Sequence, residues 1–212
     1  MSEAMESPYL SLQNINLKIK NQQLFSDFSL TVNKGEAVLL KGKSGKGKST
    51  LLKMIPGFMK FDSGSIILEG KELNRHNLKY FRERISYVSQ DTDLRNENVE
   101  QLLQEILKYK ANRHISCTPE TFRDLIREFH LEEDTPVKKI RELSGGERQR
   151  LGIILTIILD RDIWIMDEIT SAMDPELKKL TAEKLLSLNK TLILTSHDSQ
   201  WENDPRVRVV EL

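Results

Sequence analysis

Gly42-Lys-Ser-Gly-Lys-Gly-Lys48-Ser49-Thr50 directly follows a continuous apolar run, Ala37 to Leu40, which is typical of a strand buried on both faces. This segment, called the phosphate loop below, matches G-x-x-x-x-G-K-[ST], a pattern that needs a strand before it and a helix after it. Its glycines let several backbone N–H groups turn toward one anion, and a helix beginning near Ser49 directs positive partial charge to the same point. The segment therefore predicts a site for phosphate groups.

Two side chains of the phosphate loop have the chemistry that a nucleoside triphosphate requires. We expect Lys48 to bridge the β- and γ-phosphates and the Ser49 hydroxyl to ligate Mg²⁺. The alternative is a glycine-rich turn whose lysines face water, and the strand-loop-helix setting argues against it. For the side chains of Lys41, Lys43 and Lys46, solvation is the expectation. The residues expected to contact the nucleotide are Gly42, Lys43, Ser44, Gly45, Lys46, Gly47, Lys48, Ser49 and Thr50.

A second signal is an apolar run, Ile163 to Met166, that ends in the adjacent carboxylates Asp167 and Glu168. Ligands of an open parallel sheet bind at the carboxyl ends of its strands, so we expect this pair beside the phosphate loop. Asp167 can hold Mg²⁺, and Glu168 can act as the general base toward water. Such a pair in isolation could equally cap the next helix. The phosphate loop favours the catalytic interpretation.

Hydrophobic periodicity predicts an α/β domain around these segments. Apolar and polar residues alternate over 10–19 and 28–32, which indicates paired antiparallel strands at the start of the chain. Between Asn98 and Glu142 the spacing is helical at 99–107 and 122–129, so a small helical subdomain is expected there. Further strand signals, separated in several places by helical patterns, predict a largely parallel sheet and lie at 65–68, 85–88, 163–166, 191–195 and 207–210.

Length and composition argue against several classes of protein. The 212 residues suffice for one domain, and 32 Lys+Arg balance 32 Asp+Glu, so we expect no nucleic-acid partner. A single cysteine, Cys117, cannot form an internal disulfide, and the first residues lack a signal-peptide pattern. The longest apolar run, Leu151 to Leu159, is far shorter than the ~20 residues that span a bilayer. A cytoplasmic chain that does not cross the membrane is the expectation.

A third signal is Leu143-Ser144-Gly145-Gly146-Glu147-Arg148-Gln149-Arg150, here called the signature segment, which precedes an apolar helical run. A simple N-cap would by itself explain Ser144. The segment resembles the signature of the ABC ATPases, and other motifs of that family occur in the family's order. Gln90 resembles the Q-loop glutamine, Ser171-Ala-Met-Asp174 the D-loop, and Thr195-Ser-His197-Asp198 the switch-histidine loop. The resemblance covers nearly the whole chain, from about Leu10 to the C-terminus.

This resemblance implies the fold and the activity. The fold would be a P-loop NTPase core with a mostly parallel sheet, an N-terminal antiparallel β-subdomain and an inserted α-helical subdomain. Residues 1–212 would form a single nucleotide-binding domain, with its core at about 1–90 and 144–212 and the helical subdomain at about 91–143. The protein would bind and hydrolyse ATP with Mg²⁺ as a transporter subunit. Its partners would be a second copy and a separately encoded integral membrane permease on the cytoplasmic face of the membrane.

The resemblance also implies a mechanism in which two chains pack head to tail. The phosphate loop of one chain and Ser144, Gly145 and Gly146 of the other would hold each ATP. Gln90 would contact Mg²⁺ and water, His197 would contact the γ-phosphate and orient Glu168, and Asp174 would link the two sites.

Some positions depart from the family's pattern. The stretch 18–23 lacks the aromatic residue on which family members stack adenine, so Ile19 would offer only an apolar platform. Tyr9 and Phe25 lie nearby in sequence, and we expect Phe25 in the core. Ile169 stands where the family usually has proline, a variant that resembles small ATPases of iron-efflux systems.

Two other functions remain open at this point. The first is an ABC ATPase that acts on ribosomes or DNA, although such proteins generally carry tandem domains or long coiled coils. The second is a small-molecule P-loop kinase, which would phosphorylate an acceptor instead of releasing phosphate. Neither the transported solute nor its direction follows from these residues.

Overall fold

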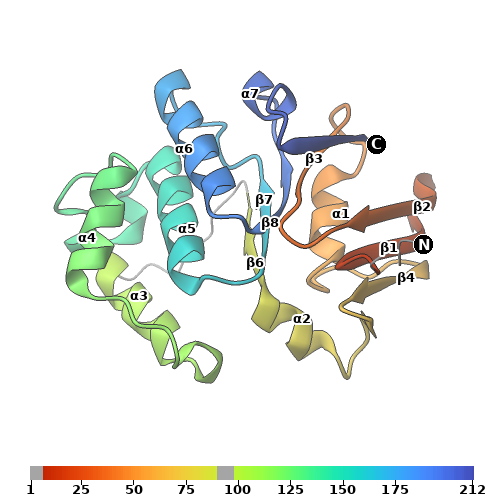
Figure 1. The fold of residues 1–212 in the computed structure, drawn as a ribbon, viewed down its shortest axis with the longest axis horizontal. Helices are drawn as coiled ribbons and strands as arrows, with labels where there is room; N and C mark the ends of the chain where they lie inside the picture. The colour runs from red at the N-terminus through yellow and green to blue at the C-terminus, as the bar shows by residue number, and fades with distance from the viewer. Residues whose placement is uncertain (1–6, 90–97) are drawn as a thin grey trace, which may run out of the picture.

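The N-terminal part of the chain forms an antiparallel sheet, in a computed structural model that describes residues 7–89 and 98–212 (Figure 1). Strands β1 (Leu10–Ile19) and β2 (Gln22–Val32) form a hairpin, in which Lys20 supplies a left-handed turn residue with φ of 54°. Strands β4 (Ser63–Leu68) and β5 (Lys71–Glu72) extend the sheet in the order β2-β1-β4-β5. The expected antiparallel β-subdomain is therefore confirmed. The strand at 65–68, expected in the parallel sheet, instead belongs to this one, because it pairs antiparallel with β1.

A second sheet lies at the centre of the molecule, with every neighbouring pair of its strands parallel. The described strands follow the order β6-β7-β8-β3-β9. Their bounds are β3 Ala37–Lys41, β6 Ile85–Val88, β7 Ile163–Asp167, β8 Thr191–Thr195 and β9 Val207–Glu211. Because these strands are parallel, their carboxyl ends meet at one edge, where the phosphate loop and the Asp167-Glu168 pair begin.

Helices flank the central sheet, and none of those described is long and apolar enough to cross a bilayer. Helix α4 begins at Pro119, three residues before residue 122, where the apolar spacing predicted its start. The reason is that Thr118 caps its N-terminus and proline suits the first turn of a helix. The helices are α1 Lys48–Met54, α2 Leu78–Arg84, α3 Val99–Lys108, α4 Pro119–Glu128, α5 Gly145–Leu159, α6 Pro175–Ser187 and α7 Ser199–Glu202, with 3₁₀ turns at Lys110–Asn112, Thr135–Val137 and Ile140–Glu142.

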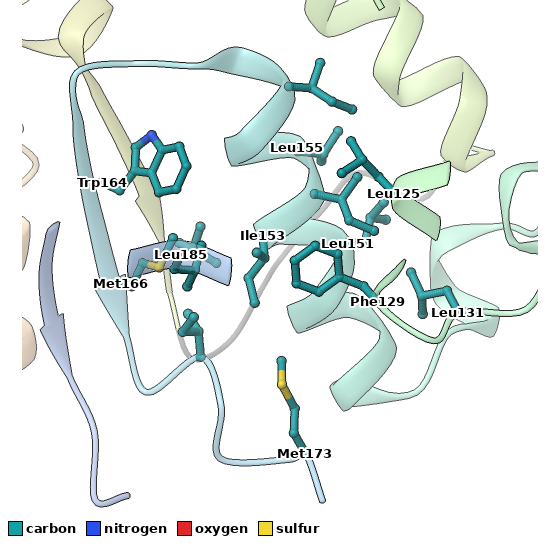
Figure 2. Close-up of a cluster of buried hydrophobic side chains, with 14 of the residues drawn as sticks. Leu125, Phe129, Leu131, Leu151, Ile153, Leu155, Trp164, Met166, Met173 and Leu185 are labelled. Atoms are coloured by element: carbon teal, nitrogen blue, oxygen red, sulfur yellow. The ribbon is translucent and has the colours of Figure 1, made fainter. Parts of the chain in front are cut away.

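The two faces of the central sheet carry different helices, as the alternation of buried residues along β7 shows. Ile163 and Ile165 pack in one hydrophobic cluster with α1 and the antiparallel sheet. Trp164 and Met166 point the other way, into a second cluster formed with α3, α4, α5 and α6 (Figure 2). Figure 1 shows this layering, with α5 and α6 on one side of the strands and α1 on the other. The N-termini of α1 and α5 therefore lie on opposite faces of one sheet.

Candidate functional site

A cavity of about 760 Å³ opens where the phosphate loop meets the first hairpin. It is lined by hairpin residues 19–22 and 24, by phosphate-loop residues 44, 45 and 47–50, and by Glu168. Gly47 is left-handed, with φ of 91°, and a Cβ there would come within 2.8 Å of the Leu24 and Phe25 side chains. Both the conformation and the space thus require glycine at this position.

Lys48 is held inside the phosphate loop by backbone carbonyls. Its Nζ donates to the carbonyl oxygen of Gly42 at 2.7 Å and to that of Lys43 at 3.4 Å, and the residue is only 8% exposed. Lys43 also accepts a backbone hydrogen bond from Lys46, whose side chain is exposed, as expected. Gly47 is the N-cap of α1, and no side chain caps this helix end, so its first N–H groups can bind an anion.

Asp167 and Glu168 lie at the end of β7, and Thr195 at the end of β8 contacts both. The Thr195 hydroxyl donates to Asp167 Oδ1 at 2.7 Å and accepts from the Glu168 N–H at 3.1 Å. Asp167 is 4% exposed. Glu168 has a φ of 51°, a left-handed conformation that turns the chain out of the strand, and its side chain lines the same cavity as Lys48. The structure therefore places the Asp167-Glu168 pair beside the phosphate loop, as expected.

His197 lies next to Glu168 and is largely exposed. The distance between His197 Nε2 and Glu168 Oε1 is 3.4 Å, and the histidine side chain is 67% exposed. Both residues line a smaller cavity of about 160 Å³ that also includes Ser171 and Asp198. These four residues place the D-loop and the switch-histidine loop side by side within one chain.

The loop that carries His197 is anchored through Asp198. This carboxylate accepts hydrogen bonds from Lys178 Nζ at 2.5 Å, Thr170 Oγ1 at 2.6 Å and Ser196 Oγ at 3.2 Å. Burial acts to raise the pKa of Asp198, but the hydrogen bonds from Lys178, Thr170 and Ser196 outweigh it and hold the pKa below its ordinary value. A charged Asp198 thus ties the histidine loop to α6.

Ser144 caps α5, as the simplest explanation of this residue predicted. Its Oγ accepts from the Glu147 N–H at 3.3 Å, and its own N–H donates to Glu147 Oε2 at 2.7 Å, which completes a capping box. Hydrogen bonding from Ser144 holds the pKa of Glu147 below its ordinary value, against the effect of burial. A Cβ added to Gly145 would meet no atom within 4 Å, whereas a Cβ added to Gly146 would come within 2.9 Å of the Ala172 carbonyl oxygen. The signature segment is therefore packed against the D-loop of its own chain.

Asp174 also occupies a helix N-terminus. Its Oδ1 accepts from the Leu177 N–H at 2.9 Å, and this bond is the main cause that lowers the pKa of Asp174. The carboxylate is exposed to solvent. The D-loop aspartate therefore caps α6 and remains on the surface.

The expected site residues fall into two separate groups. The phosphate loop, Glu168 and His197 lie together, whereas Ser144, Gly145 and Gly146 do not line the large cavity. Gln90 lies outside the described residues. At the hairpin, Ile19 lines the large cavity and is 38% exposed.

Tyr9 and Phe25 are not available to stack on a base in that cavity. Their exposed fractions are 8% and 5%, and both side chains belong to the hydrophobic cluster beneath the antiparallel sheet. The expectation that Phe25 lies in the core is confirmed.

Two features of the site could not be predicted from the sequence. The first is the contact of Thr195 with both acidic residues, because a β-branched residue at the end of an apolar strand is ordinary. The anchoring of Asp198 by Lys178 and Thr170 joins segments at least 20 residues apart, and no local spacing marks such a contact. The Asp-Glu pair was recognisable because its carboxylates are adjacent.

Comparisons with known proteins agree with this geometry. Residues 25–171 match the ABC transporter family. A probable iron export ATP-binding protein, FetA of Escherichia coli K12, is 33% identical over 93% of this chain and 88% of its own length. The ATP-dependent lipid A-core flippase of Methylobacillus flagellatus is 32% identical over 94% of this chain, which spans only 36% of that longer protein.

Solved structures show the same fold. A dimeric ATP-binding cassette, in a post-hydrolysis state bound to ADP and Pi, aligns with a TM-score of 0.75 at 27% identity and covers 90% of this chain and 89% of its own. An ATP-binding subunit of an ABC transporter aligns with a TM-score of 0.76 at 25% identity, over 89% of this chain and 79% of its own. The expected P-loop NTPase architecture is thereby confirmed.

Proposed function

This chain belongs to the ABC transporter family, as an ATP-binding and ATP-hydrolysing subunit, and from that premise we propose how its residues form the working site. ATP binds in the cavity of about 760 Å³, a size within the range of about 300–1,000 Å³ that is common for ligand pockets. The backbone N–H groups of the phosphate loop and the Lys48 ammonium hold its phosphates. Ile19 provides an apolar surface for the base.

The residues at the cavity also suit Mg²⁺. Mg²⁺ prefers oxygen ligands and is usually held by one or two carboxylates together with substrate phosphates. Ser49 lines the cavity and supplies a hydroxyl, and Asp167, next to the lining residue Glu168, supplies a carboxylate. Gln90, outside the described residues, is proposed as a third contact. Mg²⁺ bound there would polarise the terminal phosphoryl group.

Glu168 and His197 supply the proton chemistry in this proposal. Glu168 accepts the proton of the attacking water, because Glu168 lines the same cavity as Lys48 and Ser49. His197 Nε2, 3.4 Å from Glu168 Oε1, orients that carboxylate and contacts the terminal phosphate. The Lys178–Asp198 ion pair fixes the loop that contains His197.

One observation carries the proposal that two chains form each site: α1 and α5 pack on opposite faces of one sheet. The phosphate loop and the signature segment of one chain therefore cannot grip one ATP from both sides. A second copy placed head to tail brings its Ser144, Gly145 and Gly146 over the phosphates, and the exposed Asp174 then meets the partner chain. The dimeric cassette among the similar structures supports this arrangement.

Ser144→Arg tests the composite site, because a long cationic side chain would fill the space where the partner's ATP should lie. We expect ATP-dependent dimerisation to weaken at least about tenfold, corresponding to about 1.4 kcal/mol, while ATP binding to the monomer is retained. Analytical ultracentrifugation with a non-hydrolysable ATP analogue measures the first quantity, and calorimetry measures the second.

The control for Ser144→Arg must remove a helix cap without adding bulk, since Ser144 also caps α5. Thr118→Ala does so, because the Thr118 hydroxyl accepts from the Thr121 N–H at 3.1 Å at the start of α4. Both variants should lose about 1 kcal/mol of unfolding free energy, but only Ser144→Arg should lose dimers. Wild-type dimerisation of Ser144→Arg contradicts a composite site.

We further propose a separately encoded integral membrane permease as the partner, with the chain on the cytoplasmic face of the membrane. The similarity to FetA, named as an ATP-binding protein, supports this, although one relative in Haemophilus influenzae is a probable ATP-binding/permease protein. The same similarity makes iron a proposed solute. The proposed helical subdomain, residues 91–143, includes α3 and α4 and is the proposed docking surface, because family members dock on their membrane subunits through this subdomain.

Co-purification from the native membrane, combined with a phosphate-release assay, tests this function. The proposal predicts ATP-dependent release of free phosphate and recovery of an integral membrane protein with the chain. Recovery of ribosomes or DNA instead would support the alternative of a non-transport ABC ATPase. Transfer of phosphate to an acceptor would identify a kinase.

A further inference from the structure

Thr195 is a buried polar residue at the junction of three groups that the proposed mechanism uses, although that mechanism assigns it no role. The residue is fully buried, and its Cα pairs with that of Asp167 across β7 and β8. Glu168 follows Asp167 directly, and His197 lies two residues beyond Thr195. One hydroxyl group is therefore placed between the acidic pair and the histidine loop.

The hydrogen bonds of this hydroxyl have a fixed direction. A backbone N–H can only donate, so Thr195 Oγ1 must accept from Glu168 at 3.1 Å. The single hydroxyl hydrogen is then directed to Asp167 Oδ1 at 2.7 Å. Engaging one oxygen of the Asp167 carboxylate fixes the plane of that group and leaves the other oxygen for a metal.

The same residue also sets the backbone of Glu168. The Glu168 N–H is shared between the hydroxyl and the backbone carbonyl of Thr195, each at 3.1 Å. Glu168 holds a left-handed φ of 51°, which is unfavourable for a residue with a Cβ and persists only where surrounding contacts enforce it. These two contacts fix the backbone of Glu168, a residue that lines the cavity.

We infer that Thr195 is a positioning residue for ATP hydrolysis, whose hydroxyl orients the Asp167 carboxylate toward Mg²⁺ and holds Glu168 as the base. This inference rests on the proposed function. Its chemical basis is that a misplacement of about 1 Å in a reacting group can cost ~100-fold in rate. No bond to Thr195 is made or broken in the reaction.

Thr195→Val tests the inference, because valine keeps the β-branched shape and the backbone carbonyl but removes the hydroxyl. We expect kcat for ATP hydrolysis to fall about 10- to 100-fold, the loss typical of a hydrogen bond to a charged group. At saturating Mg²⁺, KM for ATP should change less than about threefold, because the phosphate loop is untouched. In calorimetry with a non-hydrolysable ATP analogue, the Mg²⁺ concentration for half-maximal binding should rise about tenfold. Thr195→Ser, which keeps the hydroxyl, should restore both kcat and the Mg²⁺ midpoint.

Thr191→Val is the matched control within the same strand. Thr191 is also buried, and its hydroxyl accepts from the Gly35 N–H at 2.9 Å, away from the acidic pair. Both valine variants should lower the melting temperature, whereas only Thr195→Val should change kcat and the Mg²⁺ midpoint. Unchanged kcat and Mg²⁺ midpoint in Thr195→Val, or equal losses in both variants, overturn the inference. Absence of phosphate release by the wild type would instead contradict the proposed function itself.

Discussion

Glu168→Gln is expected to lower the rate of ATP hydrolysis about 100- to 10,000-fold, the range by which general base catalysis accelerates reactions. Glutamine has nearly the same shape but cannot accept the proton of the attacking water. The fold of the site should persist, because the hydrogen bonds from residue 168 to Thr195 come from the backbone N–H. Phosphate release under saturating ATP measures the effect.

The same substitution should increase the population of the ATP-bound dimer. In the proposed cycle hydrolysis removes the phosphate that both chains hold, so a chain that binds ATP without cleaving it remains closed. Glu183→Gln is the control, since Glu183 is an exposed residue of α6 and should leave the rate unchanged. Hydrolysis by Glu168→Gln at the wild-type rate would remove Glu168 from the role of base.

Lys48→Ala is expected to weaken binding of the triphosphate about 100-fold, or ~3 kcal/mol, because each hydrogen bond to a charged group contributes about 1.5–3 kcal/mol. The ammonium is already held at the loop by the Gly42 and Lys43 carbonyls, so it needs little reorganisation to meet phosphate oxygens. Calorimetry with a non-hydrolysable analogue of ATP gives the affinity directly.

Lys53→Ala controls for the loss of one positive charge near the phosphate loop. Lys53 lies in the last turn of α1 and is exposed, so its removal should change the affinity only slightly. Equal affinities of Lys48→Ala and the wild type would contradict the assignment of the phosphate loop. A loss confined to Lys48→Ala would support it.

The sequence predicts those parts of this site whose residues are adjacent along the chain. The phosphate loop and the Asp167-Glu168 pair each lie in one short segment, where spacing alone indicates the chemistry. Thr195 lies 28 residues from Asp167, and only strand pairing brings the two together. A threonine at the end of an apolar strand has no local feature that marks it as a contact of a carboxylate.

The fold, too, could be predicted from the sequence only in part. Polar residues between the apolar ones of β1 and β2 were enough to predict the antiparallel strands, but they do not predict the irregular burial of β1, which follows from its register shifts. Strand β7 is buried throughout, so its sequence does not indicate that Ile165 faces α1 while Trp164 faces α5. Only the packing of the folded chain shows which residue of β7 faces which helix, and therefore that the phosphate loop and the signature segment lie on different faces of the sheet.

The most direct test of the two-chain site is sedimentation of an equal mixture of Lys48→Ala and Ser144→Arg chains with ATP, both also carrying Glu168→Gln. In a head-to-tail pair of these chains one site keeps an intact Lys48 and an intact Ser144, while the other site loses both. We predict that either variant alone dimerises at least about tenfold more weakly than the mixture, whose dimers hold one ATP each. A mixture that remains monomeric, or dimers formed equally well by each variant alone, would contradict the account.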